Sequence, residues 1–262
     1  MAYTTFELTV EDGLARLTLN QPDLGNPFNS EACREFVEVA NDLGARTGVR
    51  AVLLTGRGRF FSVGGDLSMF SRDPDGIAGT VLRQTAHLHM GMARLLQLDA
   101  PIVASVHAAA MGGAMAVVAN CDLVYAAHSA KIGAAYTHIG FTCDLGATAG
   151  LASRMGISRA RRFLLLGETL GAEQAQQVGL VDEVFEDGDL ADAAERMALQ
   201  LSRGPTRAYG EIRRLMSRSL ATPFESQLEN EAQALARVAA LSDAREGIEA
   251  FKNKRRPHFT GR

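Results

Sequence analysis

The first half of the chain alternates between short apolar runs and turns that contain glycine. Leu14–Leu19 alternates apolar and polar residues, which is the pattern of a half-buried strand. The runs Ala51–Thr55, Ile102–Val106 and Leu123–Ala126 are almost entirely apolar, as in strands buried on both faces. A glycine-containing turn and a helix are expected after the first two of these runs. This repetition predicts an α/β fold built as a stacked spiral.

Capping and breaking residues set the limits of the main helices. Ser30 is placed to cap a helix that runs to about Leu43. A second helix, residues 80–98, should end before Pro101, because the residue that precedes a proline avoids helical backbone. Asp189 is placed to cap another helix.

The last part of the chain has helical patterns and no expected strand. Pro223 should open a long helix that continues to about Lys252. Its apolar face would consist of Leu228, Ala232, Leu235, Val238 and Leu241. We therefore divide the chain into a spiral core, residues 1–203, and a C-terminal helical region, residues 204–262.

Composition excludes several classes of protein. The net charge of -3 leaves no basic excess that would attract nucleic acid. The longest apolar stretch, Pro101–Ala119, contains His107 and a glycine pair, so it fits a buried strand and helix better than a membrane span. The N-terminus lacks the pattern of a signal peptide, and we expect a cytoplasmic protein. No CxxC pair exists that would indicate a disulfide framework or zinc site; the cysteines are Cys33, Cys121 and Cys143.

Two loops each place a pair of glycines just after a predicted buried strand. They are Ser62–Asp66 and Met111–Ala114. If the loops face each other, the backbone N–H groups of Gly65 and Gly113 can donate to one oxygen atom and form an oxyanion hole. The alternative is a pair of ordinary tight turns. Neither loop matches a phosphate-binding loop or a dinucleotide-binding fingerprint.

Several motifs, in order from Phe6 to Arg262, resemble the crotonase (enoyl-CoA hydratase/isomerase) superfamily. The motifs that carry the resemblance are Asn20–Asn29, Leu54–Leu67, Ala110–Ala114 with Cys121 and Asp122, and Leu166–Ala175 with Gly179–Val184. The resemblance implies a stacked ββα spiral, an acyl-CoA substrate, and a homotrimer or a dimer of trimers built by the C-terminal helices. It also implies no metal and no cofactor beyond the coenzyme A of the substrate. Gly65 and Gly113 stand where the family has its oxyanion donors.

The acid–base residues differ from those of the hydratases that this chain resembles. A hydratase holds water between two glutamates, and the matching positions here are Ala116 and Tyr136. Neither side chain accepts a proton from water near neutral pH. Asp144 is the remaining carboxylate, and it matches the catalytic aspartate of the enoyl-CoA and dienoyl-CoA isomerases. Its alternative role is to cap a helix that begins near Gly146.

Among subgroups, the chain resembles most the phenylacetate-pathway epoxyphenylacetyl-CoA isomerases, over Ala135–Asp144, Leu165–Gly179 and the C-terminal tail. Similarity to chlorobenzoyl-CoA dehalogenase implies a second set of roles. There an aspartate at the position of Asp144 is a nucleophile, and its partner histidine matches His89. The alternative for His89 is a histidine on a helix surface. Further pocket candidates are His138 and His107.

The resemblance also implies where coenzyme A would bind. Its adenine and pantetheine would lie along the loop at 24–26 and along 62–67, and Lys254 in the basic tail would meet its phosphates. Residues assigned to coenzyme A are Leu24, Asn26, Ser62, Gly64, Asp66, Leu67 and Lys254. A solvated charged end is the alternative for the tail.

These residues favour an acyl-CoA isomerase in which Asp144 moves a proton while Gly65 and Gly113 stabilise the enolate. The reaction is either a double-bond shift or the rearrangement of a ring epoxide. Two alternatives stay open. One is another crotonase reaction, such as hydration, thioester hydrolysis or aryl-CoA dehalogenation through His89 and Asp144. The other is a non-catalytic protein that binds acyl-CoA.

Overall fold

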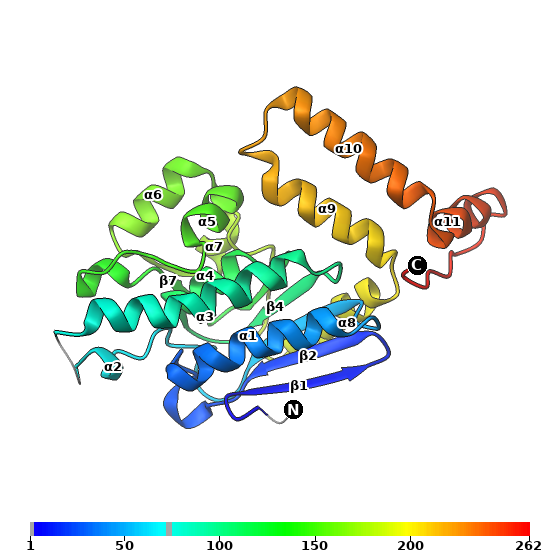
Figure 1. The fold of residues 1–262 in the computed structure, drawn as a ribbon. Helices are drawn as coiled ribbons and strands as arrows, with labels where there is room; N and C mark the ends of the chain where they lie inside the picture. The colour runs from blue at the N-terminus through cyan, green and yellow to red at the C-terminus, as the bar shows by residue number, and fades with distance from the viewer. Residues whose placement is uncertain (1–2, 72–74) are drawn as a thin grey trace.

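The computed structural model describes residues 3–71 and 75–262. A six-stranded sheet in the order β1-β2-β3-β4-β6-β9 forms its centre (Figure 1). β1 is antiparallel to β2, and every later pair in this sheet is parallel. The strands are β1 (Phe6–Glu11), β2 (Leu14–Leu19), β3 (Ala51–Gly56), β4 (Ile102–Val106), β6 (Leu123–Ala127) and β9 (Glu183–Phe185).

A second, smaller sheet makes the fold a spiral of two strands and a helix per turn. It has the order β5-β7-β8, with β5 (Ala110–Met111), β7 (Lys131–Gly133) and β8 (Thr169–Gly171). The chain passes from β4 to β5, forms a helix, and then passes from β6 to β7. These two turns each add a strand to both sheets, and the predicted stacked ββα spiral is confirmed.

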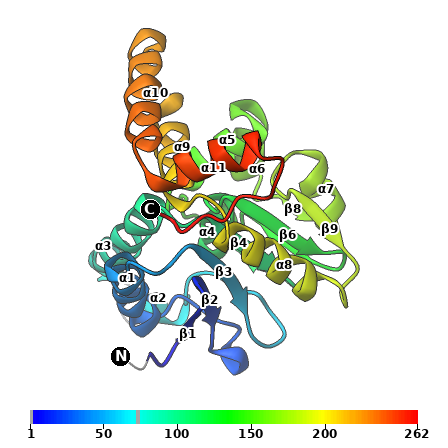
Figure 2. The ribbon, with the colours of Figure 1, turned by 90° about the vertical axis from the view of Figure 1, so that its right-hand side faces the viewer.

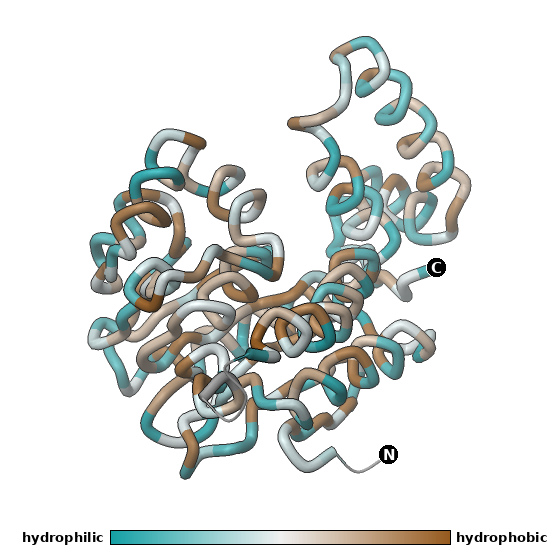
Figure 3. Tube along the Cα trace, turned by 60° about the vertical axis from the view of Figure 1, so that its left-hand side comes forward, coloured by the Kyte–Doolittle hydropathy of each residue, from teal (hydrophilic) through white to brown (hydrophobic). Residues whose placement is uncertain are grey.

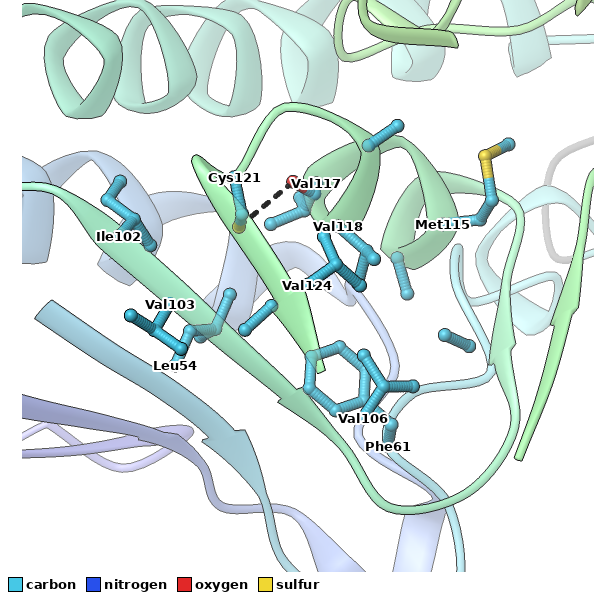
Figure 4. Close-up of a cluster of buried hydrophobic side chains, with 14 of the residues drawn as sticks. Leu54, Phe61, Ile102, Val103, Val106, Met115, Val117, Val118, Cys121 and Val124 are labelled. Carbon is cyan, nitrogen blue, oxygen red and sulfur yellow. Dashed lines mark hydrogen bonds between the residues drawn. The ribbon is translucent and has the colours of Figure 1, made fainter. Parts of the chain in front are cut away.

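Helices cover the faces of the large sheet. α1 and α3 pack side by side, and α8 packs on β2, β3, β4 and β6 (Figure 2). The helices before residue 204 are α1 (Ser30–Ala45), α2 (Ser68–Ser71), α3 (Ile77–Gln97), α4 (Gly113–Ala119), α5 (Ala147–Met155), α6 (Ile157–Leu165), α7 (Ala172–Gln177) and α8 (Leu190–Ser202), with the short 3₁₀ helices η1 (Pro22–Leu24) and η2 (Tyr136–Ile139). Val103, Val118 and Val124 pack in the fully buried core beneath them (Figure 4).

Three helices follow the spiral: α9 (Thr206–Ser219), α10 (Phe224–Ala239) and α11 (Ser242–Lys252). α9 contacts α3, whereas α10 extends away from the sheets (Figures 1 and 2). Hydrophobic and hydrophilic residues are interspersed along these helices (Figure 3). No helix in the described ranges is long and apolar enough to cross a bilayer.

Two local predictions were wrong, and a third was right only in position. Ser30 is the first residue of α1, and Asn29 caps the helix by accepting the N–H of Ala32 at 2.9 Å. Asp189 holds the N-cap position of α8 as predicted, but its side chain makes no capping bond. The expected long helix is two helices, because Leu241 has extended backbone between α10 and α11. The periodic apolar pattern continues across this break, so it did not reveal it.

Candidate functional site

The two glycine loops lie against each other at the end of the central strands. Ser62 donates its N–H to Ala109 at 3.1 Å, and Met111 donates to Ser62 at 3.0 Å. Gly64 has φ +86°, and a Cβ built on it would lie 2.5 Å from the carbonyl oxygen of Met111. Only glycine fits at this position, because any side chain would separate the two loops.

The amides of Gly65 and Gly113 lie beside each other and have no acceptor among the described residues. Phe28 donates its N–H to the carbonyl of Gly64 and accepts the N–H of Asp66. In this parallel pairing the N–H of Gly65 points away from Phe28. Gly113 is the first residue of α4, and its N–H has no acceptor within the helix. A Cβ on Gly64 would lie 3.4 Å from the nitrogen of Gly113, whereas a Cβ on Gly65 would meet nothing within 4 Å. Both N–H groups are thus unused donors, and there is open space beside Gly65.

Asp144 is half-buried in the loop that precedes α5. Its Oδ1 accepts a hydrogen bond of 2.9 Å from the hydroxyl of Tyr136. Burial raises the pKa of the Asp144 carboxyl, although the hydrogen bond from Tyr136 opposes that shift. Gly146 holds the capping position of α5 with no side-chain bond, so the alternative role of Asp144 as a helix cap was wrong.

The hydroxyl of Tyr136 remains protonated and donates to Asp144. Burial raises the pKa of Tyr136, and the negative charge of Asp144 raises it further. The side chain comes from η2, which follows Ala135, a residue with φ 55°. A Cβ on Gly112 would lie 3.9 Å from the Tyr136 ring, so this ring borders the second glycine loop.

The other pocket candidates lie in different surroundings. Ala116 is fully buried in α4 and offers no polar group. His89 accepts the N–H of Leu145 at its Nε2 atom, at 3.1 Å. His138 is exposed in η2 and lies against Gly167. His107 bonds to the carbonyl of Gly58 at 3.0 Å, on a separate loop.

Residues assigned to coenzyme A fall into three groups. Leu24, on the loop at 24–26, and Leu67, just after the first glycine loop, are exposed. Asn26 and Ser62 are buried, and their side chains bond within the protein rather than outward. The amide nitrogen of Asn26 donates to three carbonyls at 2.8 to 3.0 Å, and Ser62 donates to the carbonyl of Asn26 at 2.7 Å. Both side chains therefore hold the loops in place.

Three further coenzyme A candidates differ in position. Gly64 forms the contact between the loops, and the carboxylate of Asp66 accepts the N–H of Ser68 at 3.0 Å. Lys254 follows α11, at the opposite end of the molecule from α2 (Figure 1). One chain alone does not bring Lys254 to the two loops.

Tyr136, a predicted pocket residue, lines a cavity of about 480 Å³ whose walls on α5 and α6 were not predicted. The cavity lies between the 136–143 segment and helices α5 and α6. Its walls are mostly apolar and include Phe141, Cys143, Ala152, Ala160 and Leu164. The wall residues on α5 and α6 have ordinary helical spacing, so the sequence carried no signal that they enclose a cavity. In the described ranges no cluster of three or more His, Cys, Asp and Glu side chains is suited to a metal.

A family model described as enoyl-CoA hydratase/isomerase matches residues 9–262. The chain belongs to the enoyl-CoA hydratase/isomerase family. It is 34% identical to the "Probable enoyl-CoA hydratase" of Rhodobacter capsulatus, with all of both chains covered. It is also 34% identical to the 1,2-epoxyphenylacetyl-CoA isomerase of Escherichia coli, with 97% of each chain covered. The crystal structure of an enoyl-CoA hydratase from Mycobacterium smegmatis superposes with a TM-score of 0.90 at 28% identity, covering 98% of this chain and 99% of that one.

Membership in this family makes the chain an enzyme of the enoyl-CoA hydratase/isomerase type. Its relatives carry the names of both hydratases and isomerases, so the family alone leaves the reaction open.

Proposed function

We propose that the protein is an acyl-CoA isomerase that moves a double bond, or rearranges a ring epoxide, through a thioester enolate. The thioester oxygen accepts hydrogen bonds from the amides of Gly65 and Gly113. Asp144 removes a proton from the acyl chain and returns it to another carbon. The observation that carries the proposal is the half-buried Asp144, whose raised pKa makes it a stronger base than an exposed aspartate.

The choice of isomerisation over hydration follows from the number of proton-transfer groups. Addition of water needs one group to activate the water and one to protonate carbon. The buried methyl group of Ala116 does neither, and the raised pKa of Tyr136 makes its hydroxyl a poor acid. A double-bond shift needs one group that accepts a proton and gives it back, and Asp144 is sufficient for that.

The proposal also assigns binding sites to the acyl group and to coenzyme A. The acyl group occupies the cavity beside Tyr136, and coenzyme A lies along the exposed residues Leu24 and Leu67. The tail that carries Lys254 reaches the phosphates of coenzyme A bound to another copy of the chain. The helices after residue 204 would assemble those copies into a homotrimer or a dimer of trimers.

Two substrates separate the candidate reactions. A 3-enoyl-CoA should be converted to the conjugated 2-enoyl thioester, with a rise in ultraviolet absorbance and no net uptake of water. Crotonyl-CoA should lose almost none of its absorbance, because its hydration is not catalysed. Rapid hydration of crotonyl-CoA without isomerisation would overturn the proposal, and turnover of neither substrate alongside tight acyl-CoA binding would favour a binding protein.

A further inference from the structure

Leu145, the residue after Asp144, has an unusual backbone conformation. Its φ is 50°, in the left-handed region that branched and bulky residues seldom adopt. Its side chain is buried and lies beside Gly113, where an added Cβ would come within 3.3 Å of Leu145 Cδ1. A conformation of this kind persists only where the surrounding structure holds it.

Both backbone polar groups of Leu145 are held by side chains from other elements. Its N–H donates to Nε2 of His89, on α3, at 3.1 Å. Its carbonyl accepts from Nδ2 of Asn120, at the end of α4, at 3.2 Å. A ring nitrogen that accepts a backbone N–H carries no proton of its own, so this contact already uses the Nε2 lone pair of His89.

The side chain of Asn120 is itself confined. Its Nδ2 donates a second bond, at 2.9 Å, to the carbonyl of Ala116. An added Cβ at Gly150 would lie 2.8 Å from Nδ2 of Asn120, and one at Gly146 would lie 3.4 Å away. Two glycines thus leave the space that the amide fills, and both of its amide hydrogens have acceptors.

We infer that His89 and Asn120 are positioning residues that fix Asp144 through the backbone of Leu145. This inference rests on the proposed role of Asp144 as the proton carrier. His89 acts here as a hydrogen-bond acceptor and takes no proton from substrate. The two side chains hold the peptide groups on either side of Leu145 and so set where the carboxyl group of Asp144 stands.

The test compares substitutions that keep or remove each hydrogen bond. His89→Gln keeps an acceptor near the position of Nε2, whereas His89→Leu removes it. Asn120→Asp has the same shape but replaces the donor with a carboxylate that faces two carbonyl oxygens. His87→Gln on the same helix and Asn41→Asp on α1 are matched exposed controls. We would measure kcat and KM for 3-enoyl-CoA isomerisation, with thermal unfolding of each variant.

We expect kcat to fall about 10- to 100-fold in His89→Leu and Asn120→Asp, because small displacements of a catalytic group have effects of this size. KM should change little in both variants. His89→Gln should retain kcat within a few-fold of the wild type, and the controls should match it.

Equal losses of kcat in His89→Gln and His89→Leu would overturn the inference. They would indicate that His89 takes part in the reaction directly. Wild-type kcat in His89→Leu would also overturn it. If Asn120→Asp does not fold, the two His89 variants still decide. Asp144→Asn is assayed alongside to separate the proposed function from the positioning role. If only Asp144→Asn loses activity, Asp144 remains the proton carrier and His89 and Asn120 do not position it.

Discussion

The strands of the spiral and the C-terminal helices bury their apolar residues to very different extents. Leu17 and Val103 in the large sheet are at most 1% exposed. On α10, by contrast, Ala234 is the buried residue and Leu235 is 71% exposed. The large apolar side chains exposed after residue 204 are Ile212, Met216, Leu220, Phe224, Leu228, Leu235, Ile248 and Phe251. The spiral buries its apolar residues in its own core, whereas the C-terminal helices leave theirs exposed, and the proposed assembly would cover them with another copy of the chain.

The largest effect on stability should come from a cavity made in the core of the spiral. Leu17→Ala on β2 should lower the free energy of unfolding by about 2–5 kcal/mol, the usual range for a buried leucine. Leu82→Ala on α3 is the matched control, because Leu82 is 72% exposed and its loss should change stability by less than about 0.5 kcal/mol. Chemical denaturation measures both. Similar values for the two variants would contradict the assignment of Leu17 to the core.

The next effect concerns the oxyanion hole, which the spiral builds without help from the C-terminal helices. Gly113→Pro removes one donor at the first position of α4, where proline is tolerated, and should cost about 3 kcal/mol of transition-state stabilisation. Gly113→Ala adds the same Cβ, close to Leu145 and Phe28, but keeps the N–H. We therefore expect kcat/KM for isomerisation to fall far more in the proline variant, with CoA binding by calorimetry preserved in both. Wild-type turnover in a folded Gly113→Pro variant would remove Gly113 from the site.

A smaller effect should appear in assembly. Leu235→Glu would place a charge on the exposed apolar surface of α10. It should weaken the free energy of subunit association by about 1.5–3 kcal/mol, the value of burying one leucine side chain. Sedimentation should then show dissociation of a trimer or hexamer into smaller species. A wild-type protein that sediments as a stable monomer at micromolar concentration would contradict this reading of the C-terminal helices.

The smallest effect is on stability as a function of pH. Because burial raises the pKa of Asp144, the native state holds this proton more tightly than the unfolded chain. The resulting stabilisation is full below the pKa of the unfolded chain and is lost as pH rises through the native pKa. Asp144→Asn should therefore be slightly more stable than the wild type at about pH 7, and the difference should vanish at about pH 3. Thermal unfolding at both pH values checks this, and a less stable variant at pH 7 would contradict it.

Much of the fold could be predicted because apolar runs and glycine pairs determine strands and tight turns from neighbouring residues alone. The strands at 51–56 and 102–106, and the glycine loops that follow them, were recognisable because buried strands and tight turns have strong local patterns. The break at Leu241 left the helical period unchanged and was missed. Asn120 was missed for a different reason, since an asparagine at a helix end acquires its role only when the loop at 145 folds against it.

The residues assigned to coenzyme A show that a sequence motif does not reveal which of its side chains contact the ligand. Asn26 and Ser62 were assigned to ligand contact, yet their side chains are buried and bonded to the loops. A motif records that residues are needed at a site, but it does not distinguish those that touch the ligand from those that hold the loops. Burial makes that distinction, and it requires the three-dimensional structure.

The most direct test of the central claim is the rate of 3-enoyl-CoA isomerisation by Asp144→Asn. The asparagine oxygen still accepts from Tyr136, so the substitution removes the proton-accepting carboxylate while it preserves that hydrogen bond. The account predicts a loss of about 10²- to 10⁴-fold in kcat with little change in CoA affinity. Isomerisation at the wild-type rate, or efficient crotonyl-CoA hydration that survives Asp144→Asn, would contradict it and assign the proton transfer to another group.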